Sequence, residues 1–427
     1  MFEFAQNFFR RDQPFCVGEF PQIWASFIDA FIDTIHAQGP AATRPTQIAE
    51  PVTFLPAAER IVAIGDLHGD VDKTKRALRL GGLIDEAGNW TGGHTVAVQV
   101  GDQLDRGGNE VEILYLLERL QKQAARAGGA LHVLNGNHEF MNIAGDVRYA
   151  TQQGSTDFLR WRTVQGIGDN MKSSCGCGPA TGLVQQMMSK LTAPPARLDA
   201  LSAPASSSSQ PSSSPAESQE AADLAAGKSA RKRALAPGGV LTSRFMACHP
   251  VVLQIGSNIF VHAGLLPSHV DYGLERINRE SQQWMLGKAQ AAMPSYLAGK
   301  DAVVWTRNYS QRDSFKCDCV GLAQVLNMIP GASRMIVGHT IQRVANAACE
   351  GKVHRIDVGM SKGCSDRTPQ VMEILNDNEV RYLTEGPQKQ EVPEDIKTLH
   401  PVDIGMSRNP YQEGDGLVKW LQDRLGL

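Results

Sequence analysis

The sequence predicts a layered α/β domain with a largely parallel β-sheet. Three short apolar runs typical of buried strands lie at 60–65 ("RIVAIG"), 95–101 ("TVAVQVG") and 130–136 ("ALHVLNG"). The segments between them, at 71–83 and 109–129, carry apolar side chains at helical spacing, and "GG" ends the second one. This βαβαβ order is typical of domains in which helices cover parallel strands.

A compositional break separates these elements from a second set of expected strands at 251–256, 258–264, 334–340, 353–360 and 370–375. The break, at 194–239, contains "APASSSSQPSSSPAES" and a basic "ARKRA". Ser/Pro/Ala tracts hold too little apolar surface to offset the entropy of ordering, so we expect a disordered insertion. We interpret "RKR" as a solvated charge run, with a targeting or docking patch as the alternative. The main domain is then expected at 59–385, between an N-terminal extension with a helical segment at 1–58 and a C-terminal extension at 386–427.

Composition excludes several classes of partner. The chain has 427 residues, of which 42% are hydrophobic, so it can bury a sizeable core. A formal net charge of -3 gives no overall attraction to nucleic acid or anionic lipid, and no apolar run is long enough for a membrane span. The N-terminus "MFEFAQNFFRRDQPF" resembles neither a secretory signal nor a plain transit peptide, so a cytoplasmic location is expected.

Polar side chains follow the expected strands where each one ends. They are Asp66 and His68 after the first, Asp102 after the second, Asn137 after the third, and His262 and His339 after two later strands. A single histidine in such a turn is more often structural, but ligands collect beyond the carboxyl ends of strands, so these six groups are expected to converge. Oxygen and imidazole ligands without thiolates suit two borderline divalent ions such as Mn, Fe or Zn.

Asp102 is the residue that we expect to bridge the two ions. One carboxylate can hold two ions about 3.5 to 4 Å apart, which is the separation in two-metal hydrolytic sites. The first ion would take Asp66 and His68 in addition to Asp102. The second would take Asn137, His262 and His339.

Neighbouring residues suit phosphate chemistry. "GDQLDRGG" places Asp105 and Arg106 after the bridging residue, and "VVWTRNYS" supplies Arg307 as a second guanidinium for phosphate oxygens. Asn137 is a further candidate for phosphate binding. His138 is the expected general acid for the leaving oxygen, with Asp105 orienting it. A metal-bridging hydroxide would attack phosphorus directly, so no covalent intermediate and no nucleophilic cysteine are required.

The motifs "GDLHGD", "GDQLDRGG", "GNHEFMN", "VHAGL" and "VGHT", in this order, resemble those of the phosphoprotein phosphatase family of calcineurin-like metallophosphoesterases. Within it the chain is similar to the Shewanella-like protein phosphatases of plants and algae, most closely to their second, non-plastid subgroup. "GGHTVAVQVGDQLDRGG", "YGLERIN", "KCDC" and "RIDVGMSKGCSD" carry this narrower match. The resemblance implies a sandwich of two mixed β-sheets flanked by helices, and the same ligand, phosphate-binding and acid residues named above. "VHAGL" replaces the "HGG" of typical Ser/Thr enzymes, and the insertion is not a feature of the family.

The resemblance predicts a phosphoprotein phosphatase that prefers phosphotyrosine, since a phenolic leaving group depends less on general acid than an alkoxide does. Phosphoserine and phosphothreonine remain the alternative substrates. A diadenosine-tetraphosphate hydrolase is less expected because Asp105 is kept, and a purple-acid-type enzyme would need a tyrosine ligand shortly after "GD". An inactive phosphoprotein-binding scaffold would be expected to lose a ligand, and none is missing.

Eight cysteines are too few for a disulfide scaffold in a chain of this length, and most are expected to be buried thiols. Two Cys-x-Cys pairs stand out, Cys175 with Cys177 and Cys317 with Cys319. A redox-sensitive disulfide between the pairs, with a redox partner, or a zinc site are the alternatives. Redox-active pairs would also suit the mitochondrial intermembrane space as a second possible location.

Overall fold

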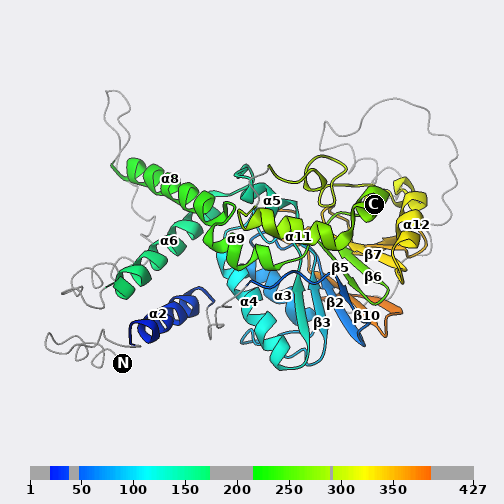
Figure 1. Cartoon of the computed structure of the whole chain (residues 1–427), viewed down its shortest axis with the longest axis horizontal. Helices are drawn as coiled ribbons and strands as arrows, with labels where there is room; N and C mark the ends of the chain where they lie inside the picture. The colour runs from blue at the N-terminus through cyan, green and yellow to red at the C-terminus, as the bar shows by residue number, and fades with distance from the viewer. Residues whose placement is uncertain (1–19, 38–47, 174–214, 289–291, 386–427) are drawn as a thin grey trace, which may run out of the picture. The chain divides into compact units, whose positions relative to one another are not determined.

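The structure is a computed structural model that describes residues 20–37, 48–173, 215–288 and 292–385 (Figure 1). The expected C-terminal extension, Cys175 and Cys177 lie outside these ranges. Each of the eight expected strands is present and begins within one residue of its predicted start. Four of them, those expected at 130–136, 258–264, 334–340 and 353–360, end three to five residues before the predicted limit. Two mixed β-sheets pack together between helices, which confirms the predicted metallophosphoesterase sandwich.

One sheet has five strands in the order β11-β10-β2-β3-β4. Its parallel part is formed by β2 (Arg60–Ile64), β3 (Val96–Gln99) and β4 (Ala130–Val133), as the alternation of strands and helices predicted. The edge formed by β10 (Gln370–Leu375) and β11 (Glu379–Thr384) is antiparallel. The sheet is therefore mixed rather than largely parallel, because the chain returns to it by a hairpin.

The second sheet has six strands in the order β1-β5-β6-β7-β9-β8. These are β1 (Phe54–Leu55), β5 (Val252–Ile255), β6 (Asn258–Val261), β7 (Arg334–Val337), β8 (Asn346–Ala348) and β9 (Val353–Arg355). The central strands β6, β7 and β9 run parallel. Their carboxyl ends consequently lie on one edge of this sheet.

The core lies between the two sheets and on their outer faces. In β2, Ile61 and Ala63 pack against Phe260 and Ile336 of the second sheet. The alternate residues Val62 and Ile64 belong to the cluster beneath the helices of the outer layer. This period of two is what a strand buried on both faces requires.

Helices cover the outer faces. Helices α3 (Val71–Leu80) and α4 (Glu110–Arg126) contribute to the apolar cluster on the five-stranded sheet. The other helices of the domain are α5 (Asn137–Ile143), α9 (Val240–Arg244), α10 (Pro267–Tyr272), α11 (Leu274–Met285) and α12 (Cys319–Met328), with short 3-10 turns at Met246–Cys248, Ser295–Leu297 and Ser314–Lys316. None of the helices in the described ranges is both long and apolar enough to cross a membrane.

Helices α2 (Phe20–Ala37), α6 (Gln152–Ser173) and α8 (Pro215–Leu235) form a further packed group. Ile28 and Ile32 of α2 pack with Val164 of α6. Helix α8 approaches α6 so closely that a Cβ on Gly227 would lie 2.2 Å from the backbone oxygen of Ser155. Glycine is therefore required at this crossing.

The expectation of disorder throughout 194–239 is wrong for its second half, because 215–235 is helix α8 and α9 follows at 240. The interpretation of "RKR" as a solvated run is also wrong for Arg231, whose side chain is fully buried. A helical stripe explains both results. It consists of Gly227, Ala230, Arg231, Ala234 and Leu235, which are buried at spacings of three and one. Its members are mostly small, so the composition concealed it.

Candidate metal centre

The predicted ligands lie in turns that follow strands, or at the start of α5, as their positions in the sequence indicated. Several of these turns adopt left-handed backbone conformations, with φ of 47° at His68, 58° at Asp102 and 65° at His339. Aspartate and histidine enter this region more readily than most residues, but at some cost in free energy. The turns thus hold their side chains in orientations that a relaxed strand end would not give.

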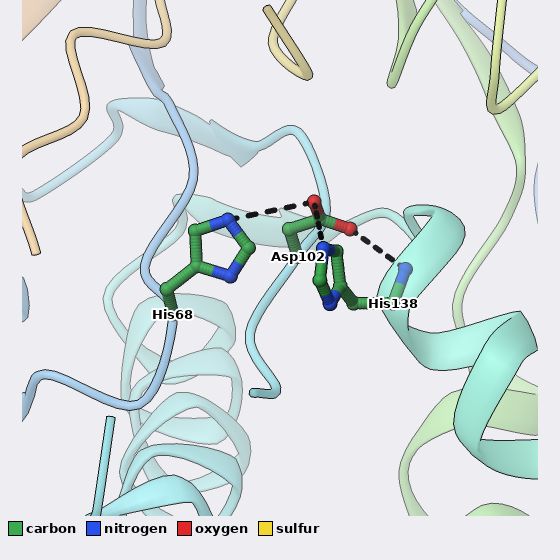
Figure 2. A group of neighbouring side chains, drawn as sticks. All are labelled: His68, Asp102 and His138. Carbon is green, nitrogen blue, oxygen red and sulfur yellow. Dashed lines mark hydrogen bonds and ion pairs between the residues drawn. The ribbon is translucent and has the colours of Figure 1, made fainter. Parts of the chain in front are cut away.

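Two groups of side chains could each hold a cation, and Asp102 belongs to both. His68 and His138 complete the first group, which Figure 2 shows, and His262 and His339 complete the second. Asp102 Oδ2 lies 3.7 Å from His68 Nε2 and 3.3 Å from His262 Nε2. One buried carboxylate therefore stands between two sets of imidazoles, where a bridging ligand would stand.

Asp66 lies at the edge of the first group. Its Oδ2 is 4.0 Å from His68 Nε2, and its carboxylate accepts the backbone N–H of His339. Burial and the neighbouring charges of Asp357 and Asp102 raise the pKa of Asp66 well above its usual value. Buried carboxylates that repel one another need a positive charge among them, so this cluster fits divalent cations.

Each of the three predicted histidine ligands directs one ring nitrogen at a backbone carbonyl. His68 Nδ1 lies 3.0 Å from the oxygen of Leu104, and His262 Nδ1 lies 2.9 Å from that of Val100. His339 Nε2 lies 3.2 Å from the oxygen of Trp305. The nitrogen that faces a carbonyl carries the proton, so the other ring nitrogen keeps its lone pair for a cation. Burial also lowers the pKa of His68 to about 4 and that of His339 well below its usual value. Both imidazoles are thus neutral, as metal ligands must be.

The remaining predicted ligand, Asn137, is the first residue of α5. Its Oδ1 lies 2.9 Å from His262 Nε2, so an amide oxygen and an imidazole nitrogen converge beside the bridging carboxylate. Although burial opposes it, Asp102 raises the pKa of His262. A cation at this point would take the place of that proton, because both neutralise the same carboxylate.

The sequence reasoning missed Glu139, which holds two of these turns together. Its carboxylate accepts the backbone N–H groups of Gly136, Asp102, Gln103 and Leu104 at 2.7 to 3.1 Å. Burial, followed by the charge of Asp102, raises the pKa of Glu139 to about 7. A glutamate two positions after Asn137 in "GNHE" was the available signal, but its partners come from a turn distant in sequence.

His138 differs from the other histidines in its partner. Its Nδ1 lies 2.6 Å from Asp105 Oδ2, a carboxylate rather than a carbonyl, while its Nε2 is 3.8 Å from Asp102 Oδ2. Although burial opposes it, Asp102 and Asp105 raise the pKa of His138. A histidine whose pKa is raised in this way is chemically suited to donate a proton, and general acid is the role that the sequence predicts for His138.

Two arginines flank this pair of groups. Arg106 lies with its guanidinium carbon 5.0 Å from the centre of the Tyr149 ring, and its Nε has no hydrogen-bond partner among the described residues. Arg307 is exposed and donates from Nη1 to Thr340, the residue after the predicted ligand His339. Both guanidiniums are therefore placed with donors left for an anion such as a phosphate.

The cysteine pairs are arranged differently from the expectation. Cys319 is bonded to Cys349, 30 residues later in the chain, and Cys317 is a buried free thiol whose Sγ donates to Tyr309 O. A zinc site or a disulfide between the two Cys-x-Cys pairs is therefore wrong for Cys319, because the fold brings the first residue of α12 to Cys349, the residue after β8. Cys175 and Cys177 lie outside the described residues.

Opening this disulfide is expected to destabilise the fold. The bond closes a loop of 30 residues, and a loop of that size corresponds to about 3.5 kcal/mol of unfolding free energy in the chain-entropy relation. We expect Cys319→Ser to lower the urea midpoint, with Cys248→Ser, which removes a free thiol, as the matched control. Equal midpoints for the two variants under oxidising conditions would contradict the assignment.

Comparison with known proteins places this geometry in a class. The model of the calcineurin-like phosphoesterase family matches residues 59–200, so the fold and the site define a metallophosphoesterase. The chain is 42% identical to Shewanella-like protein phosphatase 2 of Arabidopsis thaliana over 381 residues, covering 87% of this chain and 89% of the relative. The chain therefore belongs to the Shewanella-like protein phosphatases, a family of metal-dependent protein phosphatases.

Solved structures agree on the fold. A mutant of a cold-active protein tyrosine phosphatase superposes with a TM-score of 0.55 at 19% identity, covering 80% of this chain and 86% of its own. The cold-active protein-tyrosine phosphatase of a psychrophilic Shewanella gives a TM-score of 0.51 at 19% identity, with the same coverage.

A 41% identical stretch of 90 residues also relates the chain to Shewanella-like protein phosphatase 1 of Plasmodium berghei, covering 21% of this chain and 25% of that one.

Proposed function

We propose that this protein phosphatase hydrolyses phosphoprotein monoesters at a site for two divalent cations, Mn, Fe or Zn, and that it prefers phosphotyrosine. The observation that carries the proposal is the position of Asp102 in both candidate cation groups. When bound, two cations neutralise phosphate charge and lower the pKa of water so that it can act as the nucleophile.

The chain's own residues then divide the remaining work. Arg106 and Arg307 bind the phosphate oxygens through donors that the fold leaves available. His138 donates a proton to the leaving oxygen, and Asp105 holds its ring through Nδ1. Because water attacks phosphorus directly, no side chain of the site needs to form a bond to the substrate.

Tyr149 supports the preference for phosphotyrosine. Its side chain is 41% exposed, and its ring lies 5.0 Å from the guanidinium carbon of Arg106 and 5.1 Å from the ring of His138. An aromatic leaving group that departs towards His138 would meet this ring, and such aromatic pairs are stabilising. The cold-active protein tyrosine phosphatases that share this fold support the same class of substrate. Phosphoserine and phosphothreonine are the alternative, since an assembled general acid assists their alkoxide leaving groups most.

Matched phosphopeptides test this preference. We expect higher kcat/KM for phosphotyrosine than for phosphoserine, and Tyr149→Ala should lower the phosphotyrosine value about 2- to 13-fold, as expected for an aromatic pair worth about 0.5–1.5 kcal/mol. Tyr272→Ala, at an exposed tyrosine that ends α10, is the control. Faster hydrolysis of phosphoserine would overturn the preference.

Redox control is a separate proposal, now confined to the bond between Cys319 and Cys349 within the described residues. The backbone N–H of Asp318, next to Cys319, donates to the carbonyl of Asn308, which follows the phosphate-binding Arg307. Reduction could act on the site through this connection. Equal activity of the oxidised and the reduced protein would rule it out.

A further inference from the structure

Helix α8 brings one charged side chain into the neighbourhood of the proposed general acid. Arg231 has no solvent exposure, and its guanidinium carbon lies 4.8 Å from the centre of the Phe158 ring. Its Nη2 donates to Asp105 Oδ1 at 2.7 Å, its Nε donates to Asn142 Oδ1 at 2.8 Å, and its Nη1 is paired with Glu110. Each nitrogen of the guanidinium thus has a protein partner, and the fully buried side chain is not exposed to a substrate.

The two oxygens of Asp105 have different partners. Oδ1 accepts from Arg231, and Oδ2 accepts from His138 Nδ1 at 2.6 Å and from Asn142 Nδ2 at 3.0 Å. Asn142 also donates to the carbonyl of His138. The carboxylate is therefore held on one side by the guanidinium while its other oxygen sets the direction of the His138 ring.

Arg231 also balances the buried negative charge around Asp105. Asp105 and Glu110 are both fully buried, and the backbone N–H of Asp105 donates to Glu110 Oε1 at 2.6 Å. Arg231 is the guanidinium that pairs with both carboxylates. Without it, two buried negative charges would repel each other, and Asp105 would be free to turn away from His138.

We propose that Arg231 is a positioning residue for the general acid: from α8 it fixes Asp105, which in turn fixes the ring of His138 towards the leaving oxygen. The inference rests on the proposed function, in which His138 protonates that oxygen. It gives part of the segment between the two motif-bearing halves of the chain a role in positioning the general acid. Residues Lys232 and Arg233, next to it in the same basic run, are exposed and have no part in this network.

The variant Arg231→Met would leave two uncompensated carboxylates and risks misfolding, so we choose Arg231→Met combined with Glu110→Gln. This pair of changes removes one positive and one negative buried charge and keeps the charge of Asp105 beside His138. Lys232→Met is the matched control, because it removes an exposed cation from the neighbouring position of α8. Arg231→Lys tests whether a cation without the planar fork is sufficient.

The expected result is a loss that depends on the leaving group. For a phosphoserine peptide kcat should fall about 10- to 100-fold, because general acid catalysis contributes about 10²- to 10⁴-fold and misdirection removes part of it. For p-nitrophenyl phosphate, whose leaving group needs little protonation, kcat should fall less than about 3-fold. A purely structural role would lower both rates equally, and that result, or no loss at all in the folded double variant, would overturn the inference.

A second measurement does not depend on catalysis. The proton between His138 Nδ1 and Asp105 should give a low-field proton NMR signal, identified by its absence in His138→Gln. We expect this signal in the wild type and in Lys232→Met, and its loss in the Arg231→Met and Glu110→Gln double variant. An unchanged signal in the double variant would overturn the positioning role of Arg231, even if the activity assays failed. A wild type that shows the signal but hydrolyses neither substrate would contradict the proposed function alone.

Discussion

The substitution Asp102→Asn is expected to reduce hydrolysis of p-nitrophenyl phosphate more than about 100-fold and to abolish stabilisation by added Mn²⁺. Residues that only orient a metal ligand contribute about 10- to 100-fold, so loss of a shared ligand should cost more. The change keeps the shape of the side chain but removes the charge that faces His262 at 3.3 Å and His68 at 3.7 Å. Asp102 carries that charge stably, because the neighbouring His262 and His138 overcome the effect of burial and lower the pKa of Asp102 well below its usual value.

Three readouts separate the possible roles of this residue: bound metal after gel filtration, the shift in melting temperature on adding Mn²⁺, and the rate with Mn²⁺. Asp72→Asn is the matched control, since that carboxylate on α3 is exposed and pairs with Lys362. A variant at position 102 that kept its metal and its rate would refute the shared ligand. A wild type that bound Mn²⁺ without turnover would instead indicate a scaffold that binds phosphoproteins.

The fold could be predicted as far as local pattern determines it. The apolar runs of β2 and β3 are buried after their first residues, and β4 alternates between half-buried and buried residues. The helical stripes of α3 and α4 cover one face of this sheet, so the local sequence pattern of each element predicted its burial. The antiparallel edge of the five-stranded sheet has no local signal, because the partner of β2 comes from β10 near the end of the domain. Only the family resemblance predicted a mixed sandwich.

The residues of the candidate site also fall into those that local sequence pattern predicts and those that depend on contacts distant in sequence. Asp66, His68 and Asp102 follow directly from strand ends, and the topology brings strand ends together. Arg231 could not be predicted from strand ends, because its partner Asp105 lies 126 positions earlier in the sequence. Its helix, α8, also consists largely of alanine and polar residues and therefore gives no strong apolar pattern. The disulfide partner of Cys319 could not be predicted either, because the sequence contains several cysteines and does not determine which of them are bonded.

The choice between two roles for His138 is open to a direct test, since the structure groups it with His68 and Asp102 as well as with Asp105. We expect His138→Gln to lower kcat about 100-fold or more for a phosphoserine peptide, less for phosphotyrosine, and least for p-nitrophenyl phosphate. A general acid contributes about 10²- to 10⁴-fold, and its contribution grows with the basicity of the leaving oxygen. A metal ligand would contribute equally to all three substrates.

The metal content of the variant completes the argument. As a general acid, His138 can be replaced without loss of bound Mn²⁺, because His68, His262 and His339 keep their own ring nitrogens directed by backbone carbonyls. His132→Gln, on β4 and outside both cation groups, controls for the removal of an imidazole. A uniform loss over all three substrates together with loss of metal would make His138 a ligand, and the Asp105 contact would then orient a ligand rather than an acid.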